Sequence, residues 1–351
     1  MQLGVIGLPL VGKTTIFELL TESRNQARHP GKTNMAIARV PDDRIDFLAK
    51  MFNPRKTVYA QLEVVDIPGL VPGTAANVFL EGVRKADALL HVVGEFNVEA
   101  SDQEKGKTII DNIQMINYEL LLSDLELVDK RLERIHAGKK KNQDQKEIAL
   151  LSKLKEALEE EKPLQSVELD ENEVLMLSSY QFLTTKPMLI CLNLSEESLL
   201  NSNYSGRKEV IDFCQEYSLP VVELSADIER EIADLPEEDK PVFLEEAGIK
   251  EPGIKKIVRS MYERLGLISF FTVGEDEVKA WTIKKGTTAR KAAGKIHSDI
   301  ERGFIRAELV EYEDLKRMGT MAALREQGLF RLEGKEYIVQ DGDIIHFRFN
   351  V

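Results

Sequence analysis

The chain has 351 residues, of which 43% are hydrophobic, and a formal net charge of −13 at pH 7. This length predicts two or three domains, and the acidic balance argues against tight, nonspecific nucleic-acid binding, so DNA is not an expected partner. No apolar run approaches the roughly 18 residues of a membrane span, and the N-terminus opens directly into an apolar run, so we expect a cytoplasmic protein without membrane contact. Cys191 and Cys214 are expected to be buried, reduced thiols.

The first motif, Gly7 to Thr15, reads GLPLVGKTT and fits the pattern G-x-x-x-x-G-K-[ST]. Apolar residues precede it and an amphipathic segment follows from Ile16, which predicts a loop between a strand and a helix whose N–H groups bind phosphate. Lys13 would reach the β- and γ-phosphates, and the Thr14 hydroxyl would bind Mg²⁺. The residues expected to contact the nucleotide here are Pro9, Leu10, Val11, Gly12, Lys13, Thr14 and Thr15.

A second phosphate-site motif lies about 50 residues further on, at the end of a predicted strand. Residues Gln61 to Asp66 alternate in polarity and run into Ile67-Pro68-Gly69, which completes the pattern D-x-x-G. Asp66 would hold Mg²⁺ through water, and the Gly69 N–H would meet the γ-phosphate.

Three further apolar runs predict strands at Ala88–Val93, Pro187–Leu192 and Pro220–Leu224. Helical segments lie between them, which indicates an α/β fold, with a mainly parallel sheet and helices on both faces. Ligands of such sheets bind beyond the carboxyl ends of the strands, where the motifs fall. His91, in the middle of one strand, is predicted to be a core histidine rather than a catalyst.

The segment Asn193-Leu194-Ser195-Glu196 concerns the choice of base. Regulatory GTPases carry N-K-x-D here, and its aspartate accepts hydrogen bonds from guanine N1 and N2. With leucine in place of the lysine and glutamate in place of the aspartate, guanine loses this clamp and ATP is the expected ligand, unless the segment is only a solvated loop. A Ser-Ala pair after the next strand would supply a backbone contact, so the expected base-site residues are Asn193, Leu194, Glu196, Ser225 and Ala226.

The middle of the chain predicts two antiparallel helices. Within Ile109–Ile135, the apolar seam runs through Leu121, Leu125, Val128 and Leu132, and a second seam runs through Ile148, Leu151, Leu154 and Leu158. The short tip between them contains Lys139 to Lys141, which either contact nucleic acid or form a solvated turn.

The last 80 or so residues predict a small β-grasp-like binding module. Phe270–Ile283 and Tyr337–Val351 are strand-rich, and Ala289–Ile300 is helical. Its first half is locally basic through Lys284, Lys285, Arg290, Lys291, Lys295, Arg302 and Arg306.

Together, the phosphate loop, DIPGLV at Asp66–Val71, NLSE, the helical pair and IHSDIERGFIRAE at Ile296–Glu308 resemble the YchF/Obg-like ATPases over essentially the whole chain. The resemblance implies a P-loop nucleotide-binding domain at residues 1–118 and 171–267. It also implies an inserted coiled-coil hairpin at 119–170 and a TGS-like β-grasp domain at 268–351, with ATP preferred to GTP and association with ribosomes.

Two residues and two segments bear on catalysis within that resemblance. Leu70 stands where other P-loop GTPases carry a catalytic glutamine, as is typical of this family, and leucine cannot orient water, so hydrolysis is expected to be slow unless a partner completes the site. Leu10 replaces an expected asparagine, Pro30–Asn34 offers only Thr33 as a first-switch threonine, and the loop Pro72–Asn77 is shortened. We expect nucleotide binding to survive these changes and turnover to be the step that they weaken.

The sequence therefore predicts an Mg²⁺-dependent ATPase with slow turnover that acts as a nucleotide-gated factor on the ribosome, through ribosomal RNA and ribosomal proteins. Two alternatives stay open: a regulatory GTPase, and an adaptor that binds ATP without cleaving it. The sequence indicates neither the pathway nor the oligomeric state.

Overall fold

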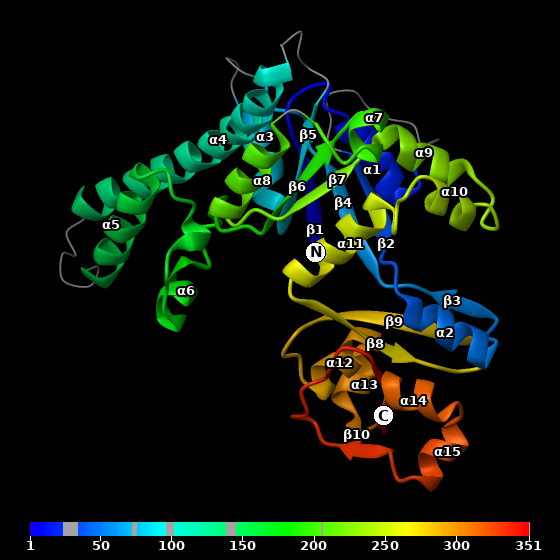
Figure 1. Cartoon of the computed structure of the whole chain (residues 1–351). Helices are drawn as coiled ribbons and strands as arrows, with labels where there is room; N and C mark the ends of the chain where they lie inside the picture. Colours follow the sequence, from blue (N-terminus) through cyan, green and yellow to red (C-terminus); the bar gives the residue numbers. More distant parts are fainter. Residues whose placement is uncertain (24–33, 72–75, 96–101, 138–144, 205, 351) are drawn as a thin grey trace. The chain divides into compact units, whose positions relative to one another are not determined.

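The computed structural model describes residues 1–23, 34–71, 76–95, 102–137, 145–204 and 206–350 (Figure 1). They form two compact units: Met1–Ala36 with Glu63–Ile257, and Ile37–Leu62 with Val258–Val351. Thr33, most of the shortened loop at 72–77 and the lysines of the hairpin tip lie outside the described residues. The domain boundaries given above stay a prediction.

Most of unit 1 surrounds a sheet in the order β2-β4-β1-β5-β6-β7, whose strands β2 and β4 run on into unit 2 at Ile37 and from Leu62. In this sheet, β1 pairs in parallel with β4 and β5, and β6 with β5 and β7. Every residue of β5 and β6 is buried, which explains their uninterrupted apolar sequence. This confirms the predicted α/β fold. The strands are β1 (Gln2–Ile6), β2 (Asn34–Arg39), β4 (Gln61–Asp66), β5 (Ala88–Gly94), β6 (Met188–Asn193) and β7 (Val221–Leu224).

Helices pack on both sides of this sheet. On one side, residues of α3, α4 and α8 share a buried apolar cluster with the strands, and elsewhere α1 contacts β1 and α9. Cys191 and Cys214 are buried free thiols, as predicted. The helices of this part of the chain are α1 (Lys13–Thr21), α3 (Asn77–Lys85), α4 (Asp102–Ala137), α5 (Gln145–Glu159), α6 (Glu171–Leu177), α7 (Glu196–Leu200), α8 (Arg207–Glu216), α9 (Ala226–Asp234), α10 (Lys240–Glu246) and α11 (Gly253–Arg264), with a 3-10 turn at Leu164–Ser166.

Helix α4 is long enough to serve two apolar cores. Ile109 and Ile113 in its first half pack against the sheet, whereas Val128 in its second half packs with Leu151 and Leu154 of α5. The two helices lie side by side in Figure 1, as the two predicted seams require.

Unit 2 has a mixed sheet in the order β11-β10-β12-β8-β9-β3. Helix α12 lies over it, and the small side chains of Ala289, Ala292 and Ala293 allow close packing against Phe270 and Phe347. The elements are α2 (Asp43–Phe52), β3 (Lys56–Val58), β8 (Leu267–Thr272), β9 (Glu277–Lys284), α12 (Ala289–Ile296), α13 (Ser298–Arg302), β10 (Phe304–Glu311), α14 (Tyr312–Met318), α15 (Met321–Glu326), β11 (Arg331–Glu333) and β12 (Asp343–Phe349).

The place of residues Ile37–Leu62 in unit 2 was not predicted. Strand β3 extends the sheet by pairing in parallel with β9, and Arg44 forms an ion pair of 2.7 Å with Asp341. In the described part of the chain, no helix is both long and apolar enough to cross a membrane.

Candidate nucleotide-binding site

The phosphate loop connects the end of β1 at Ile6 to the start of α1 at Lys13. Gly12 has φ 92°, a left-handed conformation that favours glycine, and a Cβ there would collide with the Asn193 amide. The loop therefore places the first N–H groups of α1 at the carboxyl end of the sheet, where an anion is stabilised.

Lys13 is held inside this loop rather than extended into solvent. Its Nζ donates to the Leu8 carbonyl at 2.8 Å, and the side chain is buried. Burial lowers the pKa of Lys13, while the Asp66 carboxylate acts in the opposite direction. A Cβ on Gly69 would lie 2.7 Å from Lys13 Nζ, so the glycine of D-x-x-G lets the second motif approach the phosphate loop.

Thr14 and Asp66 supply oxygen atoms beside each other. The Thr14 hydroxyl donates to Asp66 Oδ2 at 3.5 Å, and Asp66 is the last residue of β4. Hydroxyl and carboxylate oxygens are the donors that Mg²⁺ prefers, and Mg²⁺ in such sites keeps waters and phosphates as its other ligands. Among the described residues, no group of three or more His, Cys, Asp or Glu could hold a metal by itself. The pair therefore fits a metal that arrives with a nucleotide.

Asn193 links the phosphate loop to the loop after β7. Its Nδ2 donates to the Val11 carbonyl at 3.2 Å, and its Oδ1 accepts from the Ala226 N–H at 2.9 Å. Ser225, just before Ala226, is fully buried, and its hydroxyl has no hydrogen-bond partner among the described residues. Three of the predicted base-site residues are thus brought together.

The other two predicted base-site residues differ in exposure. Leu194 is 2% exposed and its side chain belongs to the apolar core, so this side chain does not take the place of the GTPase lysine at the surface. Glu196 is exposed as the first residue of α7.

The remaining predicted residues lie along the phosphate loop. Pro9, Leu10 and Thr14 are exposed, Thr15 is half-buried and Val11 is buried. Leu10 adopts φ 64°, a conformation that asparagine tolerates better than leucine. Leu70 is buried in the apolar core, so this position offers no side chain to orient water.

His91 is a core residue, as predicted. It is 1% exposed, and neither ring nitrogen has a hydrogen-bond partner among the described residues. Burial, with a smaller effect of the Lys13 charge, lowers the pKa of His91 to about 3, so the ring is neutral at physiological pH.

Two parts of the chain match known protein families. Residues 2–123 match the family described as "50S ribosome-binding GTPase", and residues 267–350 match YchF-GTPase_C, described as a protein of unknown function (DUF933). The "Ribosome-binding ATPase YchF" of Bacillus subtilis is 45% identical over 361 residues, and that of Escherichia coli O157:H7 is 38% identical over 360 residues, each with 99% of both chains covered. The chain belongs to the YchF family.

A solved YchF structure agrees with this membership. The structure of the Schizosaccharomyces pombe YchF GTPase is 32% identical, has a TM-score of 0.88, and is matched over 99% of this chain and 97% of that one. The resemblance predicted from the motifs is thereby confirmed, together with a P-loop NTPase fold and a nucleotide as its ligand.

Glu95 is a residue of this YchF site that sequence reasoning missed. It follows the end of β5, and its carboxylate accepts from the Ser195 N–H at 3.0 Å and from the Ser198 hydroxyl at 2.8 Å. A charged residue directly after a buried strand was the only sequence signal for it.

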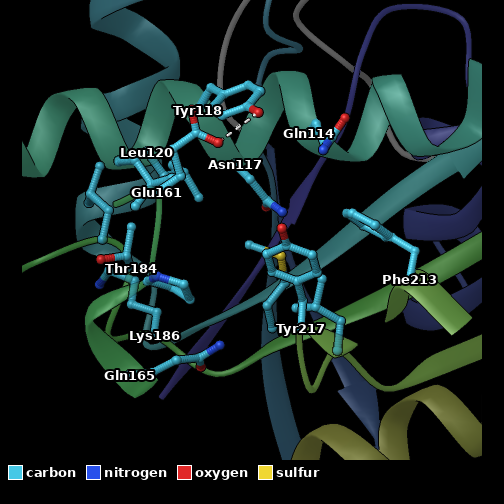
Figure 2. Close-up of a pocket in the computed structure, with 15 residues that line it drawn as sticks. Gln114, Asn117, Tyr118, Leu120, Glu161, Gln165, Thr184, Lys186, Phe213 and Tyr217 are labelled. Carbon is cyan, nitrogen blue, oxygen red and sulfur yellow. Dashed lines mark hydrogen bonds between the residues drawn. The ribbon is translucent and has the colours of Figure 1, made fainter. Parts of the chain in front are cut away.

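A pocket lies at the amino-terminal edge of the same sheet, between α4, α8 and the segment before β6 (Figure 2). Tyr118 donates to Glu161 at 3.1 Å beside it, and Lys186 donates to the carbonyls of Arg84 and Ala86. Its free volume of about 50 Å³ is far below that of typical ligand pockets. This pocket is therefore too small for a nucleotide, and the phosphate-binding motifs lie at the opposite, carboxyl ends of the strands.

Proposed function

We propose that this chain binds ATP with Mg²⁺, hydrolyses it slowly and associates with ribosomes in a nucleotide-dependent way in the cytoplasm. The observation that carries the proposal is the base loop: Asn193 joins it to the phosphate loop, Leu194 is buried, and Glu196 is exposed at the position of the guanine-binding aspartate.

The choice of adenine follows from hydrogen-bond chemistry. Guanine needs two acceptors at a fixed distance for its N1–H and N2–H groups, and a glutamate one methylene longer than aspartate does not present them in the same place. Adenine has no such pair of donors, so replacing the aspartate with glutamate removes no hydrogen bond from it. The relatives from Bacillus subtilis and Escherichia coli are named ATPases, and the Schizosaccharomyces pombe structure is titled a GTPase, so the base is the point to test.

Slow turnover follows from Leu70. In P-loop NTPases that hydrolyse efficiently, a polar side chain positions the attacking water. Here Leu70 packs into the core, while Lys13, Thr14 and Asp66 still support binding of a Mg²⁺–nucleotide complex. We expect a partner to supply the missing group during hydrolysis.

The ribosome is the partner that fits the charge distribution and the names of the curated relatives. Unit 2 carries exposed basic side chains although the chain has a net charge of −13, which favours local contacts to RNA phosphates over general RNA binding. All seven predicted basic residues are exposed: Lys284, Lys285, Arg290, Lys291, Lys295, Arg302 and Arg306. We propose the same domains as the sequence predicts, with residues 268–351 as the TGS-like module.

Single-turnover hydrolysis of labelled ATP, with and without ribosomes, tests the proposal. We expect slow cleavage alone and faster cleavage with ribosomes, with weaker stimulation at higher salt because phosphate contacts release counterions. Faster cleavage of GTP would support the regulatory GTPase. Binding of ATP without cleavage under either condition would support the adaptor.

The proposed contact can be tested separately by co-sedimentation with ribosomes. Lys291→Glu should weaken binding, whereas Lys50→Glu, at an exposed position of α2 in the same unit, should not. If both variants bind ribosomes equally well, the surface of α12 is not the contact. Point substitutions are preferable to deleting residues 268–351, because Ile37–Leu62 packs in the same unit.

A further inference from the structure

We propose that Glu95 is a positioning residue that sets the base specificity of the site by holding the second half of the base loop. The base loop is defined here as residues 193–198. The inference rests on the proposed function, in that this loop contacts the base.

The first half of the base loop is anchored without Glu95. Asn193 is bonded to Val11 and Ala226, and the Leu194 N–H donates to the Leu224 carbonyl at 2.8 Å while its side chain is buried. These contacts fix residues 193 and 194 to the sheet and to the phosphate loop.

The second half has fewer contacts to the rest of unit 1. Ser195 caps α7 by accepting from the Ser198 N–H at 3.2 Å, but this bond lies within the loop itself. Helix α7 has only five residues, and so short a helix is not stable by itself. Leu199 packs α7 against the apolar core, and this packing leaves the polar residues 195 to 198 to be held by a separate contact.

Glu95 provides that contact from a neighbouring strand. Its own N–H continues the β5–β6 pairing by donating to the Asn193 carbonyl at 3.1 Å. Its two carboxylate oxygens each accept one hydrogen bond, Oε2 from the Ser195 N–H and Oε1 from the Ser198 hydroxyl. Hydrogen bonds to a charged acceptor are stronger than those between neutral groups, so this pair of bonds holds Ser195 and Ser198 in place.

The two tethered residues flank Glu196. Ser195 precedes it and Ser198 lies on the first turn of α7, so the direction of the Glu196 side chain depends on the Glu95 carboxylate. Adenine can donate from its N6 amino group to an acceptor on this loop, such as the Glu196 carboxylate, whereas guanine has the O6 acceptor at that place. This bond to ATP is made only while the loop keeps its geometry. Glu95 acts through the loop and need not touch the nucleotide.

Calorimetric titrations with ATP, GTP and inorganic tripolyphosphate test this role, because tripolyphosphate has no base. Glu95→Ala should reduce the ATP-to-GTP affinity ratio by about ten-fold through weaker ATP binding, since two charge-assisted bonds are lost. Tripolyphosphate affinity should not change. Glu95→Gln should stay near wild type, because its amide oxygen can accept from Ser195 and its NH₂ group can donate to the Ser198 hydroxyl.

Two further variants keep the test decisive. Ser198→Ala removes one of the two contacts and should lower the ratio less than Glu95→Ala does. Glu209→Ala is the control, since it removes an exposed carboxylate of α8 in the same unit but outside the base loop, and its ratio should equal that of wild type.

An unchanged ratio in Glu95→Ala, an equal loss for all three ligands, or a Glu95→Gln variant as impaired as Glu95→Ala would overturn the inference. Failure of the proposed function looks different: wild type itself would then bind GTP as tightly as ATP. In that case, a selective loss of either nucleotide relative to tripolyphosphate would still support the positioning role.

Discussion

The Asn193 amide and the Val11 carbonyl are joined by a hydrogen bond of 3.2 Å between the end of β6 and the phosphate loop. The same amide accepts from the Ala226 N–H, so one side chain connects three loops from separate strands. Phosphate binding and base binding therefore share a structural support.

Asn193→Asp tests this support. The carboxylate can still accept from the Ala226 N–H, but it cannot donate to the Val11 carbonyl. Its negative charge would instead repel that carbonyl oxygen. Loss of one buried bond with an unsatisfied partner costs about 1–3 kcal/mol, so we expect ATP affinity to fall by about ten- to a hundred-fold. Calorimetry measures this, and an affinity within two-fold of wild type would show that the bond is dispensable.

Lys13→Ala should abolish tight binding of triphosphates. The lysine is buried between the two motifs, where its positive charge would attract the phosphates. Lys208→Ala removes an exposed lysine of α8 in the same unit and serves as the control. Retained ATP affinity in Lys13→Ala, measured by equilibrium binding, would contradict the placement of the phosphates at this loop.

Thr14→Ala and Asp66→Ala should weaken binding only when Mg²⁺ is present. Their oxygens lie 3.5 Å apart and fit a shared metal, whereas the backbone N–H groups bind phosphate without it. ATP affinity is measured with Mg²⁺ and with a chelator. A loss of equal size under both conditions would indicate a structural role instead of metal binding.

His91 should make unit 1 sensitive to acid. The folded state keeps the ring neutral down to a pKa of about 3, whereas the unfolded chain binds a proton below about 6.5. Stability is therefore lost as the pH falls through this range, by up to about 1.4 kcal/mol per pH unit. His91→Leu should lose this part of the pH dependence of unfolding, and His346→Leu, at an exposed position, should not. Parallel profiles of unfolding free energy against pH for wild type and His91→Leu would contradict this prediction.

The phosphate-binding residues could be predicted because their chemistry is local. Lys13 and Thr14 lie within one short motif, and the strand and helix on either side are visible in the pattern of apolar residues. The paired seams of α4 and α5 were predictable for the same reason, since helical periodicity is read within a few turns.

The contacts that complete the site could not be predicted because they are not local. Glu95 and Ser195 are 100 residues apart, and nothing in either segment specifies the other. Leu194 could be compared with a GTPase lysine, but its burial depends on the core around it. Likewise, β3 joins β9 through Lys56 and Glu277, a pairing that apolar patterns do not reveal.

The central claim is that the site prefers adenine, and the most direct test is calorimetric measurement of the affinities for ATP, ADP, GTP and GDP with Mg²⁺. Loss of the two-bond guanine clamp costs on the order of 1–3 kcal/mol, so ATP should bind at least several-fold more tightly than GTP, and ADP more tightly than GDP. GTP affinity equal to or greater than that of ATP would contradict the claim.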